Sequence, residues 1–107
     1  MEVKSNDSIN CTVALAGLYN VYDPEIGLNV VDLGLIYEID FKEAEKIIVI
    51  TMTLTTQFCP MGESITTDVY QTVGNAFKDY EVKINLVFDP AWGPHLISEE
   101  GQQFLNR

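Results

Sequence analysis

Basic residues are scarce in this 107-residue chain, which has six Lys and Arg residues against sixteen Asp and Glu residues and a formal net charge of −10. Binding to nucleic acid or to an anionic membrane depends on clustered Lys and Arg side chains. Here Lys42 and Lys46 are interleaved with Glu43 and Glu45, so no basic cluster forms in the sequence. Nucleic acid and membrane are therefore not expected partners, whereas a basic protein surface suits this charge.

Long hydrophobic runs are also missing. No apolar stretch reaches the roughly 20 residues that cross a bilayer, and the initial "MEVKSNDSIN" has no hydrophobic segment typical of a secretory signal. Hydrophobic residues still make up 47% of the chain, which is typical of a folded globular protein. We expect one domain covering residues 1–107 and a cytoplasmic location.

Metal-binding and catalytic residue types are few, with two cysteines and one histidine. Cys11 and Cys59 do not form a C-x-x-C pair, so neither a disulfide framework nor a self-contained zinc site is indicated. Nothing in the sequence places His95 beside either thiol. No glycine-rich phosphate loop, nucleophile elbow or H-E-x-x-H motif is present. The chain is therefore not expected to be an enzyme.

Hydrophobic periodicity is clear along most of the chain. Helical spacing over 11–22 predicts an amphipathic helix, with Asp7 or Ser8 as its N-cap and Pro24 ending it. A second helix is predicted over 61–77, and a short third helix after the N-cap residue Ser98. Alternating patterns over 35–41, 47–54 and 82–88 predict three strands. In the first of these strands, Tyr37 is placed on one face with Leu35, Ile39 and Phe41, and Ile36 on the opposite face with Glu38 and Asp40.

These elements predict an α+β fold in the order helix, strand, strand, helix, strand and short C-terminal helix. The economical packing is a small mixed sheet of about three strands with helices on one face. Cys11 falls on the apolar stripe of the first helix and is expected to be a core residue. Some RNA-binding modules share this order, but they use a basic GXXG loop that this chain lacks.

The stretch "TLTTQFCPMG" (53–62) places Cys59 between a predicted strand and a predicted helix. A cysteine there can be a buried filler, a nucleophile or a metal ligand. The amide groups at a helix N-terminus favour the thiolate, and Pro60 suits the first helical position. Thr55 and Thr56 could add hydroxyl donors, whereas the apolar Phe58 would raise the pKa of the thiol.

Four segments together resemble one family: "VYDPEIGLNVVDLGLIY" (21–37), "ITMTLTTQFCPMG" (50–62), "INLVFDPAW" (84–92) and "LISEEGQQFL" (96–105). They are similar to the small metal–sulfur cluster biosynthesis proteins that include the PaaD-like and SufT-like proteins. The resemblance extends from about Ile9 to Leu105. It implies the iron–sulfur cluster assembly domain fold and a cytoplasmic accessory factor that helps to mature iron–sulfur proteins.

The resemblance also implies a site. Cys59 matches the reactive cysteine of the family and is the expected ligand of iron or of a transient iron–sulfur cluster, with no tightly bound cofactor expected. The polar positions that the family groups around that cysteine correspond to Asp23, Glu25, Asp32, Thr55 and Thr56. Asp23, which precedes Pro24, is also an ordinary turn residue. The implied partners are apo iron–sulfur proteins and the assembly machinery.

Two further alternatives follow from the residues. The chain could be a non-catalytic adaptor that recruits apo iron–sulfur proteins to an assembly scaffold, with Trp92 as a partner anchor, although closing the end of the core is the favoured role for Trp92. It could also be a thiol enzyme acting in redox or sulfur transfer, which would require a lowered Cys59 pKa. Because iron–sulfur clusters take about four ligands and open sheet edges can pair, a homodimer is expected.

Overall fold

The computed structural model of the protein describes residues 3–24, 26–55 and 62–106. Its elements are, in chain order, β1 (Lys4–Ser5), α1 (Ser8–Leu18), β2 (Ile36–Lys42), β3 (Ile47–Met52), α2 (Gly62–Ala76), β4 (Glu81–Leu86), the 3₁₀ helix η1 (Pro94–Leu96) and α3 (Glu99–Leu105). The predicted order of helices and strands is confirmed, with the short strand β1 added before it. None of the helices in the described ranges has the length and hydrophobicity that a bilayer crossing requires.

The four strands form one mixed sheet in the order β1-β2-β3-β4. The central pair, β2 and β3, is antiparallel, while β1 runs parallel to β2 and β4 runs parallel to β3. The amide side chain of Asn6 continues the β1–β2 pairing, because it donates to the Phe41 carbonyl and accepts from the Phe41 N–H. The mixed sheet is therefore confirmed, with four strands in place of about three.

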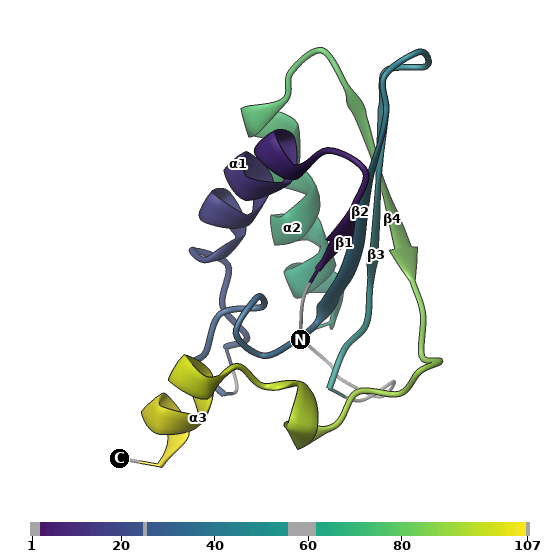
Figure 1. Ribbon diagram of the computed structural model, residues 1–107. Coiled ribbons are helices and arrows are strands. Elements are labelled where there is room, and N and C mark those ends of the chain that lie inside the picture. Colours follow the sequence, from purple (N-terminus) through teal and green to yellow (C-terminus); the bar gives the residue numbers. More distant parts are fainter. Residues whose placement is uncertain (1–2, 25, 56–61, 107) are drawn as a thin grey trace.

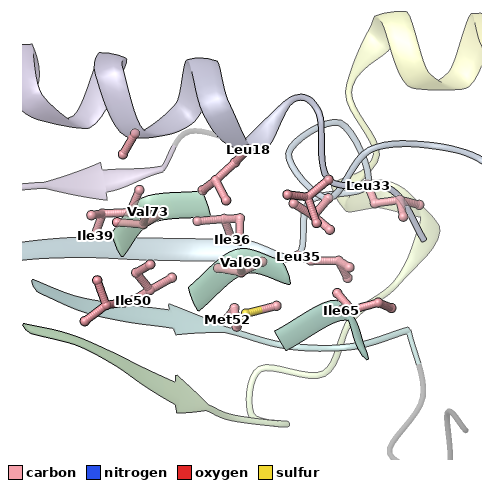
Figure 2. Packing of buried hydrophobic residues seen from close by; sticks show 14 of the residues in the cluster. Leu18, Leu33, Leu35, Ile36, Ile39, Ile50, Met52, Ile65, Val69 and Val73 are labelled. Atoms are coloured by element: carbon pink, nitrogen blue, oxygen red, sulfur yellow. The ribbon is translucent and has the colours of Figure 1, made fainter. Parts of the chain in front are cut away.

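Helices α1 and α2 lie side by side over one face of this sheet, as predicted, whereas α3 lies beyond one end of it (Figure 1). Ile65, Val69 and Val73 repeat every four residues along α2 and are fully buried. Figure 2 shows Val73 and Val69 near Ile50 and Met52 of β3, with Ile65 further along α2. This layer of apolar side chains between helices and sheet belongs to the hydrophobic core, which also includes loop residues such as Leu33 and Ile97.

The first helix begins as predicted and ends earlier. The Asp7 side chain caps it by accepting from the N–H of Asn10, and Cys11 is buried in the core with 7% exposure. The pattern predicted a helix to Val21 or Tyr22, but α1 ends at Leu18. Val21 is instead held in the following loop, where its carbonyl accepts a hydrogen bond from the N–H of Val30.

The predicted alternation at the start of β2 is wrong. The β2–β3 register shifts between Ile36 and Glu38, so that Ile36 pairs with Met52 and Glu38 pairs with Thr51. This β-bulge turns Ile36 into the core, whereas Tyr37 is buried outside the core cluster. A bulge interrupts the period of two, which the sequence pattern alone does not reveal.

Candidate functional site

Three chain segments are joined at one end of the sheet by hydrogen bonds. The loop 23–34 precedes β2, residues 53–55 follow β3, and the segment 89–98 follows β4. The N–H of Thr53 donates to the carbonyl of Leu35 at 2.9 Å, and the N–H of Ser98 donates to the carbonyl of Asp32 at 2.7 Å. Parallel strands β3 and β4 end at the same edge, so the segments that follow them meet the loop there.

The loop 23–34 is compact and hydrogen-bonded rather than extended. Asp23 is almost fully buried, its N–H donates to the Leu28 carbonyl at 3.0 Å, and its own carbonyl accepts from Gly27 at 2.7 Å. The carboxylate accepts a longer bond from the N–H of Ile26 at 3.3 Å. Gly27 has a φ of +81°, a conformation that glycine adopts without strain. The turn function of Asp23 is confirmed, and its part in a binding site stays a prediction.

The Asp32 carboxylate accepts hydrogen bonds from two side chains, one in its own loop and one near the C-terminus. One carboxylate oxygen accepts from the amide of Asn29 at 2.7 Å, and the other accepts from the hydroxyl of Ser98 at 2.8 Å. Ser98 also caps α3, because its hydroxyl oxygen accepts from the N–H of Gly101 at 3.0 Å. The predicted N-cap is confirmed, and Asp32 is the residue that links it to the loop.

Tyr37 connects the sheet to the segment after β4. The phenol of this bulge residue donates to the carbonyl of Pro90 at 2.9 Å and is 7% exposed. Burial raises the pKa of the Tyr37 phenol above its ordinary value of 10.0, and a hydrogen bond with the Thr53 side chain acts in the opposite direction. The phenol is therefore neutral at physiological pH.

Trp92 and Gly34 bring the loop 23–34 and the segment 89–98 together. The indole N–H of Trp92 donates to the carbonyl of Leu33 at 2.6 Å, and the half-buried ring packs against the core. A side chain at Gly34 would overlap the backbone of Leu96. The favoured role of Trp92 in closing the end of the core is confirmed.

Of the six predicted site residues, Asp23, Asp32 and Thr55 fall within the described residues, whereas Glu25, Thr56 and Cys59 lie outside them. Thr55 is half-buried and is the last described residue before Cys59. The described part of α2 begins at Gly62, three positions after the thiol. The placement of Cys59 at a helix N-terminus stays a prediction.

Within the described ranges, no three His, Cys, Asp or Glu side chains come together as a candidate metal site. His95 is exposed and lies in the 3₁₀ helix η1. Sequence reasoning missed Asn29, Tyr37 and the bond from Ser98 to Asp32. The bond from the Asp32 N–H to Asn29 could have been predicted from the sequence. Asn side chains commonly accept hydrogen bonds from backbone N–H groups a few residues further along the chain.

Comparison with known sequences identifies the family of this chain. A family model described as "Iron-sulfur cluster assembly protein" matches residues 12–85, a range that contains all six predicted site positions. A Porphyromonas gingivalis protein named "Fe-S protein maturation auxiliary factor" is 46% identical over 78% of this chain and 78% of its own length. The Staphylococcus aureus "Fe-S protein maturation auxiliary factor SufT" is 33% identical over 73% of this chain and 88% of its own.

A solved structure has the same fold. The crystal structure of a "Domain of Unknown Function DUF59" from Bacillus anthracis superposes with a TM-score of 0.85 and is 32% identical. The match covers 92% of this chain and 93% of the other chain. Both the α+β fold expectation and the SufT-like resemblance are therefore confirmed.

Proposed function

Because this chain belongs to the iron–sulfur cluster assembly protein family, we propose that it is an accessory factor in the assembly or transfer of iron–sulfur clusters. The observation that carries the proposal is the 46% identity to a protein named as an Fe-S protein maturation auxiliary factor. The proposed partners are apo iron–sulfur proteins and the assembly machinery, and the proposed location is the cytoplasm. The role is non-catalytic, since the cluster is cargo rather than substrate for a chemical conversion.

Cys59 is the proposed ligand for that cargo. A thiolate is the form of cysteine that binds iron, and a nearby helix N-terminus lowers the thiol pKa. In sequence, Cys59 stands three positions before the first described residue of α2. Thr55, which follows β3, is the last described residue before Cys59, and the family resemblance groups Asp23, Glu25 and Thr56 with the thiol. The other cysteine, Cys11, is buried in the core and takes no part.

A single thiol suits temporary binding. Iron–sulfur clusters take about four protein ligands, so one cysteine per chain leaves most positions to other donors. A second copy of the chain, an external thiol or the recipient protein can supply them. We propose a homodimer for the loaded state, because two copies would each supply one thiol to a shared cluster. Release to a recipient then requires only that its cysteines replace these few ligands.

The adaptor alternative is supported by an exposed apolar pair on α1. Ile9 is 77% exposed and Val13, one turn further, is 48% exposed. Exposed apolar side chains one helical turn apart can contact a protein partner, and the net charge of −10 suits a basic one. Trp92 is less suited to this role, because its indole N–H is already bonded to Leu33. In this alternative Cys59 is incidental, and recruitment depends on the surface of α1.

Maturation of an apo iron–sulfur protein in a defined anaerobic mixture tests the proposal and separates it from the alternative. Recovery of recipient activity is measured with wild type, with Cys59→Ser and with the matched control Cys11→Ser. The proposal expects Cys59→Ser alone to abolish the stimulation. If Cys59→Ser stimulates as well as wild type while the Ile9→Ser and Val13→Ser double variant does not, the chain is an adaptor. If wild type gives no stimulation, the accessory role is wrong.

A further inference from the structure

The carboxylate of Asp32 already has a protein donor on each oxygen. Asn29 donates to Oδ2 at 2.7 Å and Ser98 donates to Oδ1 at 2.8 Å. The backbone of Asp32 is held by the same two residues, since its N–H donates to Asn29 Oδ1 at 2.8 Å and its carbonyl accepts from the Ser98 N–H at 2.7 Å. Four hydrogen bonds therefore fix this one residue from two directions.

The two donors belong to segments far apart in the sequence. Asn29 lies in the same loop as Asp32, whereas Ser98 is 66 residues further along and begins α3. Ser98 connects Asp32 to α3, because its hydroxyl donates to Asp32 and accepts from the N–H of Gly101. Asp32 thus joins the loop 23–34 to the segment 89–98 and to the first turn of α3.

We propose that Asp32 is a positioning residue, which fastens the loop 23–34 to the segment 89–98 through hydrogen bonds to Asn29 and Ser98, and is not a ligand of the cargo. The inference rests on the proposed function for the identity of that cargo. It differs from the expectation carried by the family resemblance, which grouped Asp32 with the binding positions. A ligand needs a carboxylate aimed at the metal, whereas a fastening residue needs only acceptors where Asn29 and Ser98 donate.

Hydrogen-bond polarity makes the two roles separable. In Asp32→Asn, one acceptor oxygen becomes an NH₂ donor. If this group faces the Asn29 amide, two donors oppose each other, and if it faces Ser98, the hydroxyl proton loses its acceptor. Either orientation leaves a half-buried group without its partner. The variant therefore breaks the connection while changing the side-chain volume very little.

The double variant Asn29→Asp with Asp32→Asn restores the bonds with the carboxylate moved. The carboxylate introduced at position 29 accepts from the backbone N–H and the side-chain amide of position 32, while the amide oxygen introduced at position 32 accepts from Ser98. The net charge equals that of wild type. The positioning role expects this exchange to rescue the single variant, and a ligand role expects no rescue of binding.

The test measures three quantities on wild type, Asp32→Asn, the double variant and the control Asp68→Asn, which removes one exposed negative charge on α2. The first is the melting temperature. The second is the emission of the only tryptophan, Trp92, which reports the contact of the segment 89–98 with Leu33. The third is absorbance at roughly 350–450 nm after anaerobic reconstitution with iron(II) and sulfide, where thiolate–iron centres absorb.

Asp32→Asn is expected to melt about 5 °C or more below wild type, to shift Trp92 emission to longer wavelength and to lose loading. The double variant is expected to recover most of all three, and Asp68→Asn to match wild type. If the double variant recovers the melting temperature and the Trp92 emission but not the absorbance of the loaded protein, the proposal is overturned and Asp32 is a ligand. Failure of the exchange to recover melting and emission would also overturn it. If wild type itself binds no iron and sulfide, the proposed function fails. The melting temperature and the Trp92 emission then decide the positioning role by themselves.

Discussion

The indole N–H of Trp92 donates a 2.6 Å hydrogen bond to the carbonyl oxygen of Leu33, which lies 59 residues earlier in the chain. Leu33 is fully buried, so its carbonyl cannot turn to water instead. Leaving a buried carbonyl without a partner destabilises the folded state by a free energy comparable to that of a lost hydrogen bond. This contact therefore holds the segment after β4 against the loop that carries two of the predicted site residues, Asp23 and Asp32.

Replacing Trp92 by Phe tests the contact. The ring remains apolar but the donor is lost, and the Leu33 carbonyl is left without its partner. We expect the free energy of unfolding to fall by about 1–3 kcal/mol. Urea denaturation followed by circular dichroism measures this, with the exposed Tyr19→Phe as control, expected to change by less than about 0.5 kcal/mol. Equal stability of the Trp92 variant and wild type would show that the hydrogen bond contributes nothing.

Two glycines with positive φ allow close packing to be separated from backbone strain. Gly27 has a φ of +81° and open space where a Cβ would be, while Gly34 has a φ of +79° and the Leu96 backbone there. Gly27→Ala is expected to cost about 1–2 kcal/mol from the left-handed conformation alone. Gly34→Ala should cost about 1–3 kcal/mol more, because Leu96 has to move. Equal losses in the two variants would contradict the close approach of loop and η1.

The buried Tyr37 predicts a loss of stability at alkaline pH. Because its folded-state pKa is raised above 10.0, the unfolded chain releases the phenol proton first as the pH rises. The contribution of Tyr37 is therefore complete below about pH 10 and declines above it. Tyr37→Phe should be less stable than wild type at about pH 8, with a difference that narrows toward about pH 11. Denaturation curves at both values measure it, and a constant difference would contradict the raised pKa.

The core and the strand order could be predicted from the sequence because they follow from local periodicity. The spacing of Ile65, Val69 and Val73 identifies α2, and the alternation over 47–54 identifies β3. Strand β1 could not be predicted, since two residues carry no period and its partner Glu38 is 34 residues away. The bulge at Tyr37 was missed for a related reason, because one extra residue changes which side chains share a face.

The candidate site was predictable only in part. The family motifs identified Asp32, but its role depends on Ser98, and no local pattern links residues 66 positions apart. The same holds for Trp92 and Leu33. Asp23 shows the opposite case, since a turn residue before proline is a local signal and the structure confirms it. Glu25, Thr56 and Cys59 lie outside the described residues, so their grouping stays a prediction.

The proposed homodimer predicts a change of mass on loading. Each chain contributes one candidate ligand thiol, so two chains are expected to share a cluster. Light scattering of the anaerobically reconstituted protein should give twice the chain mass of 12.0 kDa. Cys59→Ser, treated in the same way, is expected to show less of this species. A mass of one chain with iron and sulfide bound would remove the shared-cluster arrangement.

The ultraviolet–visible spectrum of the protein reconstituted anaerobically with iron(II) and sulfide tests the central claim most directly, with Cys11→Ser as the matched thiol control. We predict bands at roughly 350–450 nm in wild type and in Cys11→Ser, and their absence in Cys59→Ser. Identical spectra for wild type and Cys59→Ser would contradict the claim that this thiol binds the cargo.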